Sequence, residues 1–192
     1  GNVTVVNVGP AENEQVIRKA LAIGADDAIR IDLSGDADSF AIASEIAAVA
    51  KSGGYDMVLL GKETINYNGS ALGGMLAELL DLPFISYASK LDIAGNTATI
   101  EREIEGGKEV LTVDVPFVLS AAKGMAEARI PNMKGIMSAK TKPLAVVAPQ
   151  GAASLTSVVK YELPPAKSAC KMISADHPEE LIRLLHEEAK VI

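Results

Sequence analysis

The feature that most constrains the fold is an alternation of strand-like and helix-like segments along residues 1–80. Short β-branched or apolar runs predict strands, and apolar residues recurring every three or four positions predict helices. The strand–helix pairs are residues 3–8 with 12–23, 28–33 with 38–51, and 56–60 with 70–80. Such pairs, joined by short turns, are typical of right-handed crossovers in a parallel sheet. We therefore expect an α/β protein whose Rossmann-like parallel sheet is flanked by helices.

In two of these helices the pattern also identifies the buried stripe. For residues 12–23 the stripe is Val16, Ala20, Leu21 and Ile23, with Gly24 ending the helix. For residues 70–80 it is Leu72, Leu76, Leu79 and Leu80.

After Pro83 the pattern changes. Residues 85–93, 97–104 and 109–115 alternate apolar and polar side chains, which predicts antiparallel strands added to the parallel layer. Residues 117–119 are expected to return to the main sheet, whereas residues 121–143 show no sustained period. The tail beyond Pro149 is irregular and ends in a helix over residues 177–190. One α/β domain is predicted over residues 1–149, with residues 150–192 as a C-terminal extension.

Composition narrows the function. The net charge is −7, Trp is absent and only 4% of residues are aromatic, so neither nucleic acid nor direct membrane insertion is expected. The single cysteine, Cys170, suits a reducing compartment and is expected to be a bystander. His177 and His186 are expected at the surface, and the sequence lacks metal-ligand spacing and a nucleophile elbow. An organic cofactor could supply the chemistry that the chain itself lacks.

A ligand of a parallel sheet binds beyond the carboxyl ends of its strands. The turns at Gly9-Pro10 and at residues 61–69 both lie there. The second turn opens a helix, whose free N–H groups and dipole attract phosphate, and Ser70 could cap that helix or donate to an anion. No P-loop lysine follows, and Gly73-Gly74 could serve only close helix packing. The residues alone do not decide between a ligand-binding loop and a plain turn.

Residues 123–142 form a basic segment on an acidic chain, with five Lys or Arg residues against Glu127. The segment also holds Met125, Met133 and Met137. Methionines among basic residues suit transient docking to acidic partners, but they also fill cores. A solvated loop that covers the core is the alternative.

The stretch IEREIEGGKEVLTVDVPFVLS, residues 100–120, resembles the signature of the electron-transfer flavoprotein beta subunit. The match includes Arg102, the Glu105-Gly106-Gly107 turn, Glu109 and the run PFVLS at residues 116–120. Residues 16–31, 56–65 and 127–144 also resemble that family, in the family's order. Relative to the family, the first strand and its following loop are missing before Gly1.

The resemblance implies an adenine nucleotide alpha-hydrolase-like fold and an electron carrier subunit that is not an enzyme. It implies a heterodimer with an alpha subunit that carries electrons from flavin dehydrogenases, such as acyl-CoA dehydrogenase, to a quinone oxidoreductase or another acceptor. FAD would sit mainly on the alpha subunit, with AMP or a second FAD held structurally here. Residues 150–192 would pack on the partner subunit, and the location would be the bacterial cytoplasm.

The resemblance also implies two sets of site residues. The nucleotide contacts map onto Val8, Gly61, Lys62, Glu63, Thr64, Ile65, Asn66, Tyr67, Asn68, Gly69, Ser70, Ala71 and Leu72. Partner dehydrogenases would meet a recognition loop at residues 121–143, through Met133, Lys134, Ile136, Met137, Lys140 and Lys142. Asn66, Tyr67 and Asn68 replace acidic residues common in the family, and Ala71 and Leu72 replace polar phosphate contacts.

A second reading stays open. An adenine-nucleotide-binding regulatory module of the universal-stress-protein type would share the parallel sheet but would have no flavoprotein partner.

Overall fold

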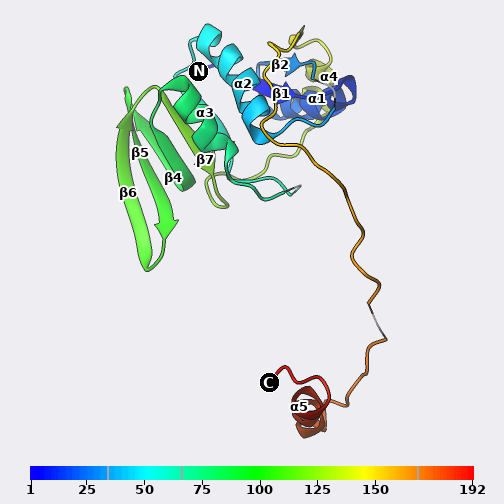
Figure 1. Ribbon diagram of the computed structural model, residues 1–192. Coiled ribbons are helices and arrows are strands. Elements are labelled where there is room, and N and C mark those ends of the chain that lie inside the picture. The colour runs from blue at the N-terminus through cyan, green and yellow to red at the C-terminus, as the bar shows by residue number, and fades with distance from the viewer. Residues whose placement is uncertain (34, 66, 168) are drawn as a thin grey trace. The chain divides into compact units, whose positions relative to one another are not determined.

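The structure is a computed structural model that describes residues 1–33, 35–65, 67–167 and 169–192. The chain forms two compact units, Gly1–Ser157 and Val158–Ile192. The boundary between them falls later than the predicted start of the C-terminal extension at residue 150. The first unit holds both β-sheets (Figure 1).

One sheet contains three parallel strands in the order β1 (Thr4–Val8), β2 (Asp27–Ile31) and β8 (Leu144–Val147). The sequence predicted the first two strands. It did not predict β8, because four apolar residues after an irregular segment give too short a run for a periodic signal. Pairing of β8 with β2 brings the end of the basic segment next to the first helix.

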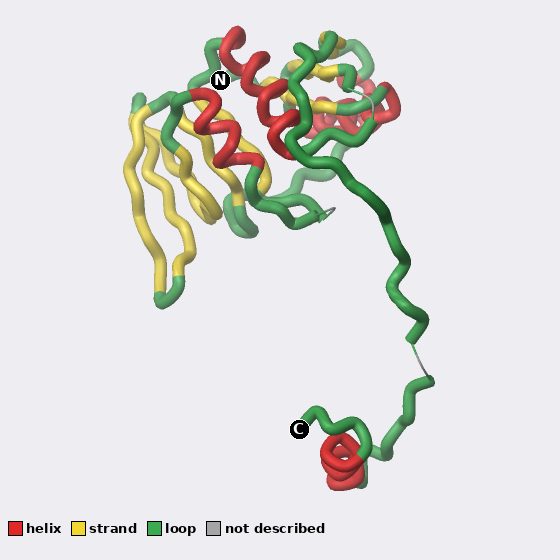
Figure 2. The backbone as a smooth tube through the Cα atoms, in the orientation of Figure 1, coloured by secondary structure: helices red, strands yellow, loops and turns green. Residues whose placement is uncertain are grey.

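The second sheet has the order β3 (Met57–Gly61), β7 (Phe117–Ala121), β4 (Phe84–Ala94), β5 (Thr97–Ile104) and β6 (Gly107–Asp114). Figure 2 shows the strands in yellow and the helices in red. β7 pairs in parallel with both β3 and β4, whereas β4, β5 and β6 are antiparallel. The expected return of residues 117–119 to the parallel layer is thus confirmed. The predicted fold class is also confirmed, with the parallel strands divided between two sheets.

The helices are α1 (Glu14–Ile23), α2 (Ser39–Gly53), α3 (Leu72–Leu80), α4 (Met133–Ala139) and α5 (Pro178–Glu187), and a 3-10 turn, η1 (Ala11–Asn13), precedes α1. The expectation that residues 121–143 lack regular structure is wrong at α4. The side chain of Asn132 accepts the N–H of Gly135 at 2.8 Å and caps this helix. Seven residues are too few to show a helical period in the sequence.

The predicted face of α1 is confirmed at Leu21 but is otherwise wrong in phase. Ile17 and Leu21 are its buried residues, and Val16 is 65% exposed. The reason is that α1 packs against β1, β2 and also α4, a neighbour that the sequence did not reveal. For α3 the prediction is confirmed, because Leu76 is buried and Leu72, Leu79 and Leu80 pack in the same cluster.

Close packing explains one glycine of the Gly73-Gly74 pair. A Cβ on Gly73 would lie 2.8 Å from the ring of Phe84 and 3.2 Å from Leu60, so α3 could not approach β3 and β4 as it does. At Gly74 the nearest ring atom would lie at 3.8 Å, an ordinary contact.

The chain beyond β8 is tied to α2 by two carboxylates. Glu45, 1% exposed, accepts the N–H groups of Gln150, Gly151 and Ala152 at 2.7–3.0 Å. Asp38 caps α2 through the N–H of Ala41 and also accepts those of residues 155 and 156. The N–H of Ala41 makes the largest contribution to lowering the pKa of Asp38. These bonds fix where the C-terminal segment leaves the first unit.

Candidate functional site

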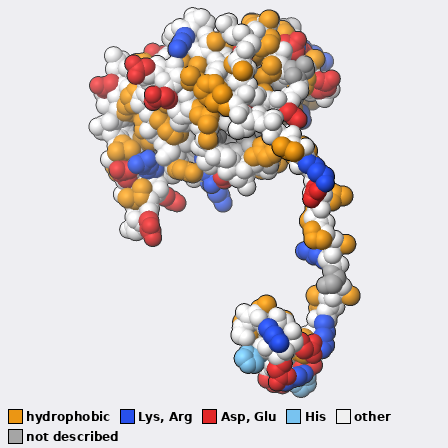
Figure 3. All heavy atoms as spheres, viewed as in Figure 1, with side chains coloured by type: hydrophobic (Ala, Val, Ile, Leu, Met, Phe, Trp, Pro, Cys, Tyr) orange, Lys and Arg blue, Asp and Glu red, His pale blue; other side chains and the backbone are white. Residues whose placement is uncertain are grey.

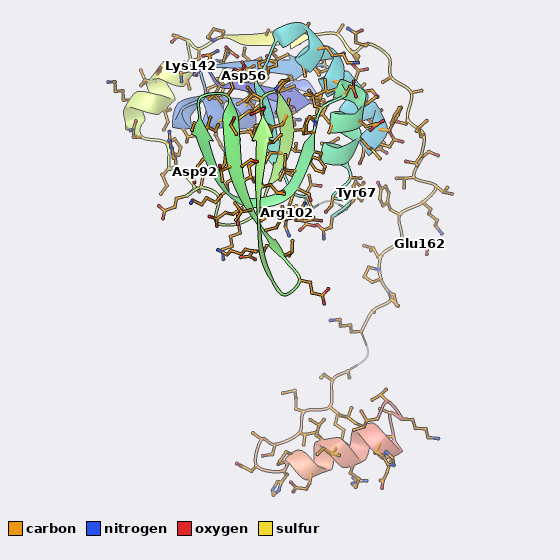
Figure 4. The ribbon with its side chains drawn as sticks, turned by 90° about the vertical axis from the view of Figure 1, so that its left-hand side faces the viewer. Asp56, Tyr67, Asp92, Arg102, Lys142 and Glu162 are labelled. Carbon is orange, nitrogen blue, oxygen red and sulfur yellow. The ribbon has the colours of Figure 1, made fainter. Side chains whose placement is uncertain are left out.

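The loop between β3 and α3 lies at the carboxyl end of β3, as the sequence predicted. Tyr67 projects from this loop (Figure 4), and Asn66 lies outside the described residues. The N–H of Asn68 donates to the carbonyl of Thr64 at 3.0 Å. Asn68 and Ser70 have φ angles of 48° and 50°, so the backbone turns through left-handed conformations just before α3.

A series of polar contacts connects the start of this loop to its end. The ammonium of Lys62 lies 2.9 Å from the carboxylate of Glu63, which accepts the hydroxyl of Ser70 at 3.3 Å. The hydrogen bond between Lys62 and Glu63 lowers the pKa of Glu63 and raises that of Lys62. Both groups are therefore charged at neutral pH.

Ser70 does not cap α3. Ala71 occupies the N-cap position, and its methyl side chain cannot accept a hydrogen bond. The hydroxyl of Ser70 is directed to Glu63 instead. Any anion at this helix start would therefore be held by backbone N–H groups, as expected from the apolar residues Ala71 and Leu72.

The other predicted ligand contact, Val8, ends β1 and is half-buried. The turn that follows it is held by Arg30 of β2, a residue that the sequence analysis did not select. The guanidinium is buried and donates to the carbonyl of Gly9 at 2.9 Å. It also contacts Asp32 at 2.6 Å and Glu14 at 3.2 Å, and the bond to Asp32 is the largest cause of its raised pKa. In the sequence, the only sign of this role is that a charged residue, Arg30, stands between Ile29 and Ile31 in an apolar strand.

The predicted docking residues gather on and around α4. Met133 is 75% exposed and lies one helical turn from the exposed Met137, with Ile136 beside them. Ile130, which the sequence analysis did not select, is also exposed just before this helix. Lys134 and Lys140 are exposed to solvent. Met133 and Met137 are therefore not core residues, whereas Met125 is half-buried and packs against the core cluster of the five-stranded sheet.

Lys142 differs from the other two lysines. Its ammonium donates to the carbonyl of Leu21 at 3.0 Å and to that of Ala25, at the C-terminal end of α1. Arg18 of α1 in turn donates to the carbonyls of Ala139 and Lys142 at 2.7 and 2.6 Å. Lys142 therefore helps to hold the segment after α4 on α1. Its ammonium forms hydrogen bonds within the fold, which makes it less available to a partner than those of Lys134 and Lys140.

Two residues of the sequence signature, Arg102 and Ser120, form hydrogen bonds with β4. Arg102 of β5 lies 2.5 Å from Glu109 of β6 and donates to the hydroxyl of Ser86 at 3.1 Å. Ser120 of β7 is buried and accepts the N–H of Tyr87 at 3.0 Å. The signature is visible in the sequence, but the contacts of Arg102 and Ser120 with β4 are not.

Within the described ranges there is no cluster of three or more His, Cys, Asp or Glu side chains that could hold a metal ion. In the same part of the chain, no helix has the length and apolar character needed to cross a membrane. Cys170 is exposed.

Comparisons with known proteins agree with this arrangement. The family model described as "Electron transfer flavoprotein domain" matches residues 1–151 of this chain. The electron transfer flavoprotein subunit beta of Bacillus subtilis (strain 168) is 35% identical over 205 residues, covering 100% of this chain and 80% of that protein. The same subunit of Syntrophomonas wolfei is 37% identical, covering 98% and 74%. That of Homo sapiens is 33% identical, covering 98% and 76%.

The α/β fold and these matches together define the chain as an electron carrier subunit. The chain belongs to the electron transfer flavoprotein family, and its similar relatives are beta subunits.

Proposed function

We propose that this chain is the beta subunit of a heterodimeric electron transfer flavoprotein in the bacterial cytoplasm. Paired with an alpha subunit that carries most of the FAD contacts, it passes electrons from flavin dehydrogenases to a quinone oxidoreductase or another acceptor. The observation that carries the proposal is the family match over residues 1–151, together with 35% identity to a beta subunit along the whole chain.

The nucleotide of this subunit, AMP or a second FAD, binds at residues 61–72 and near Val8. Three features support this placement. The loop follows a parallel strand and opens α3, where the backbone N–H groups are free of helical partners. Left-handed residues at Asn68 and Ser70 turn the backbone toward that helix start. Arg30 holds the Gly9 turn beside Val8.

This proposal predicts the ligands retained by the purified complex. Co-expressed with an alpha subunit, the chain is expected to yield a yellow heterodimer that contains one FAD and one AMP, or two FAD. Absorbance of the intact complex and chromatography of the released nucleotides measure this content. A colourless complex would contradict the carrier function. A complex with one FAD and no second nucleotide would contradict only the placement at residues 61–72.

Dehydrogenases dock through the exposed surface of α4. Met133, Ile136 and Met137 offer flexible apolar side chains that a partner can bury, which is typical of adaptable binding surfaces. Lys134 and Lys140 attract an acidic partner on approach. Lys142 contributes by holding α4 on α1.

Replacing Met133 with glutamate is expected to slow dehydrogenase-dependent flavin reduction in the heterodimer by about tenfold or more, because docking would bury an unpaired charge. Met133 is the first residue of α4, where an acidic side chain is compatible with the helix dipole, so stability should change by less than about 0.5 kcal/mol. Stopped-flow absorbance with an acyl-CoA dehydrogenase as electron donor measures the rate.

Two controls accompany this variant. Met133→Leu keeps an apolar side chain and is expected to retain the rate. Thr112→Glu adds the same charge at an exposed position of β6, a strand of the five-stranded sheet, and should also leave the rate unchanged. Wild-type kinetics in Met133→Glu would remove this residue from docking.

The second unit, Val158–Ile192, packs on the alpha subunit. Many of its apolar side chains are exposed, with Val159, Leu163 and Met172 the most accessible, although Leu184 is buried. Figure 3 shows hydrophobic side chains along the segment that leads to α5. Leu181 and Ile182 of α5 are also exposed. A partner surface would cover these groups, which is the reason for assigning this unit to subunit assembly.

A further inference from the structure

Strand β4 contains a bulge at Ser86 and Tyr87. Ile85 pairs with Leu119 and Ala88 pairs with Ala121, so these two residues lie opposite the single residue Ser120 of β7. Tyr87 has a φ angle of 58°. A left-handed conformation is unfavourable for a bulky aromatic residue and persists only where its surroundings impose it.

The surroundings that impose it are the signature residues. Ser120, 3% exposed, uses its hydroxyl to accept the N–H of Tyr87 in place of a strand carbonyl. Arg102, itself held by Glu109, donates to the hydroxyl of Ser86. Just beyond the bulge, the N–H of Ala122 donates to the carbonyl of Ala88 at 2.8 Å. Hydrogen bonds from β5 and β7 thus hold the bulge from both sides.

The bulge directs the ring of Tyr87 to the loop between β3 and α3. The ammonium of Lys62 lies 5.8 Å from the centre of this ring, within the range of a cation–π contact. The backbone N–H of Lys62 donates to the carbonyl of Ala121 at 3.0 Å, which fixes the start of the loop. From Lys62 the contacts continue through Glu63 to Ser70, directly before α3.

Bending β4 does not by itself require an aromatic residue. The bulge lies where β4 ends its parallel pairing with β7 and begins its antiparallel pairing with β5, and bulges commonly provide such bends. Glycine would adopt the left-handed conformation without strain. Tyr87 remains 43% exposed, so core packing does not account for its ring either. The contact with Lys62 does account for an aromatic ring at this position.

We propose that Tyr87 is a positioning residue for the loop at residues 61–72. Its ring holds Lys62, which holds Glu63, and Glu63 fixes Ser70 at the entrance to α3. The loop is thereby kept in the conformation that receives an adenylate. The inference rests on the proposed nucleotide function for its affinity readout, but not for its effect on loop order.

The test compares Tyr87→Gly with Tyr87→Phe in the heterodimer. Tyr87→Gly removes the ring and relieves the left-handed strain, so its melting temperature should equal or exceed that of the wild type. Its dissociation constant for AMP should rise about two- to fivefold, the effect of one exposed cation–π contact. Hydrogen exchange of the Asn68 amide, which bonds to Thr64, should become faster. Tyr87→Phe keeps the ring and should match the wild type in both measurements.

Tyr87→Asn serves as a second variant if Tyr87→Gly melts early, since asparagine also tolerates the left-handed conformation. Wild-type exchange at Asn68 in the variants that lack the ring would overturn the proposal. Losses in Tyr87→Phe as large as in Tyr87→Gly would overturn it too. If the wild type binds neither AMP nor a second FAD, the nucleotide proposal fails, and the exchange measurement still decides the role of Tyr87.

Discussion

Replacing Glu45 with glutamine is expected to lower the free energy of unfolding of the Gly1–Ser157 unit by roughly 3 kcal/mol. The carboxylate is buried and accepts three backbone N–H groups, those of residues 150, 151 and 152. The amide of glutamine offers only one acceptor oxygen, and its NH₂ group would face a backbone N–H. At least one of the three N–H groups beside the buried side chain would lose its partner, which is costly.

Chemical denaturation of the heterodimer and of the isolated chain measures this change. Glu78→Gln, at an exposed position of α3, is the matched control and should shift stability by less than about 0.5 kcal/mol. Hydrogen exchange should accelerate at residues 150–152 in the variant. It should change less at residues 155 and 156, whose amides bond to Asp38. A denaturation midpoint equal to that of the control would contradict the role of Glu45.

Glu45 also shows what local sequence can and cannot predict. The helix SFAIASEIAAVAK was predicted from its apolar period, and a single acid in that run is visible by eye. Its partners, however, lie 105 to 107 residues further along the chain. Such long-range contacts leave no periodic signal. The same reason accounts for the missed β8, whose pairing with β2 is non-local, and for the wrong face of α1, which follows from α4.

For the candidate site, the position of the loop was predictable and its internal contacts were not. The sequence pattern placed the turn at residues 61–69 correctly at the carboxyl end of β3, the end of a parallel strand at which ligands bind. Whether Ser70 caps α3 or bonds to Glu63 depends on side-chain geometry, so the sequence left that open. Lys134 and Lys142 look alike in the basic segment, yet only Lys142 reaches the carbonyls of α1.

Replacing Gly135 with alanine is expected to displace α4 and to disable docking. A Cβ at this position would lie 2.3 Å from the carbonyl oxygen of Ala22 in α1, and backbone cannot yield as a flexible side chain would. The two helices share a cluster that includes Leu21 and Ala139. Forcing them apart should cost about 1–3 kcal/mol of stability. Dehydrogenase-dependent flavin reduction should fall about tenfold or more, equivalent to roughly 1.4 kcal/mol of docking free energy.

The matched control is Gly74→Ala in α3, where the new Cβ meets the Phe84 ring at an ordinary 3.8 Å. Alanine there should be neutral or stabilising by up to about 1 kcal/mol. The two α4 variants separate cause from effect, since Met133→Glu should slow reduction without loss of stability, whereas Gly135→Ala should do both. Because the clash lies between α1 and α4, the FAD content of the heterodimer should stay unchanged in Gly135→Ala. Wild-type reduction kinetics in a destabilised Gly135→Ala heterodimer would show that partners dock elsewhere than on α4.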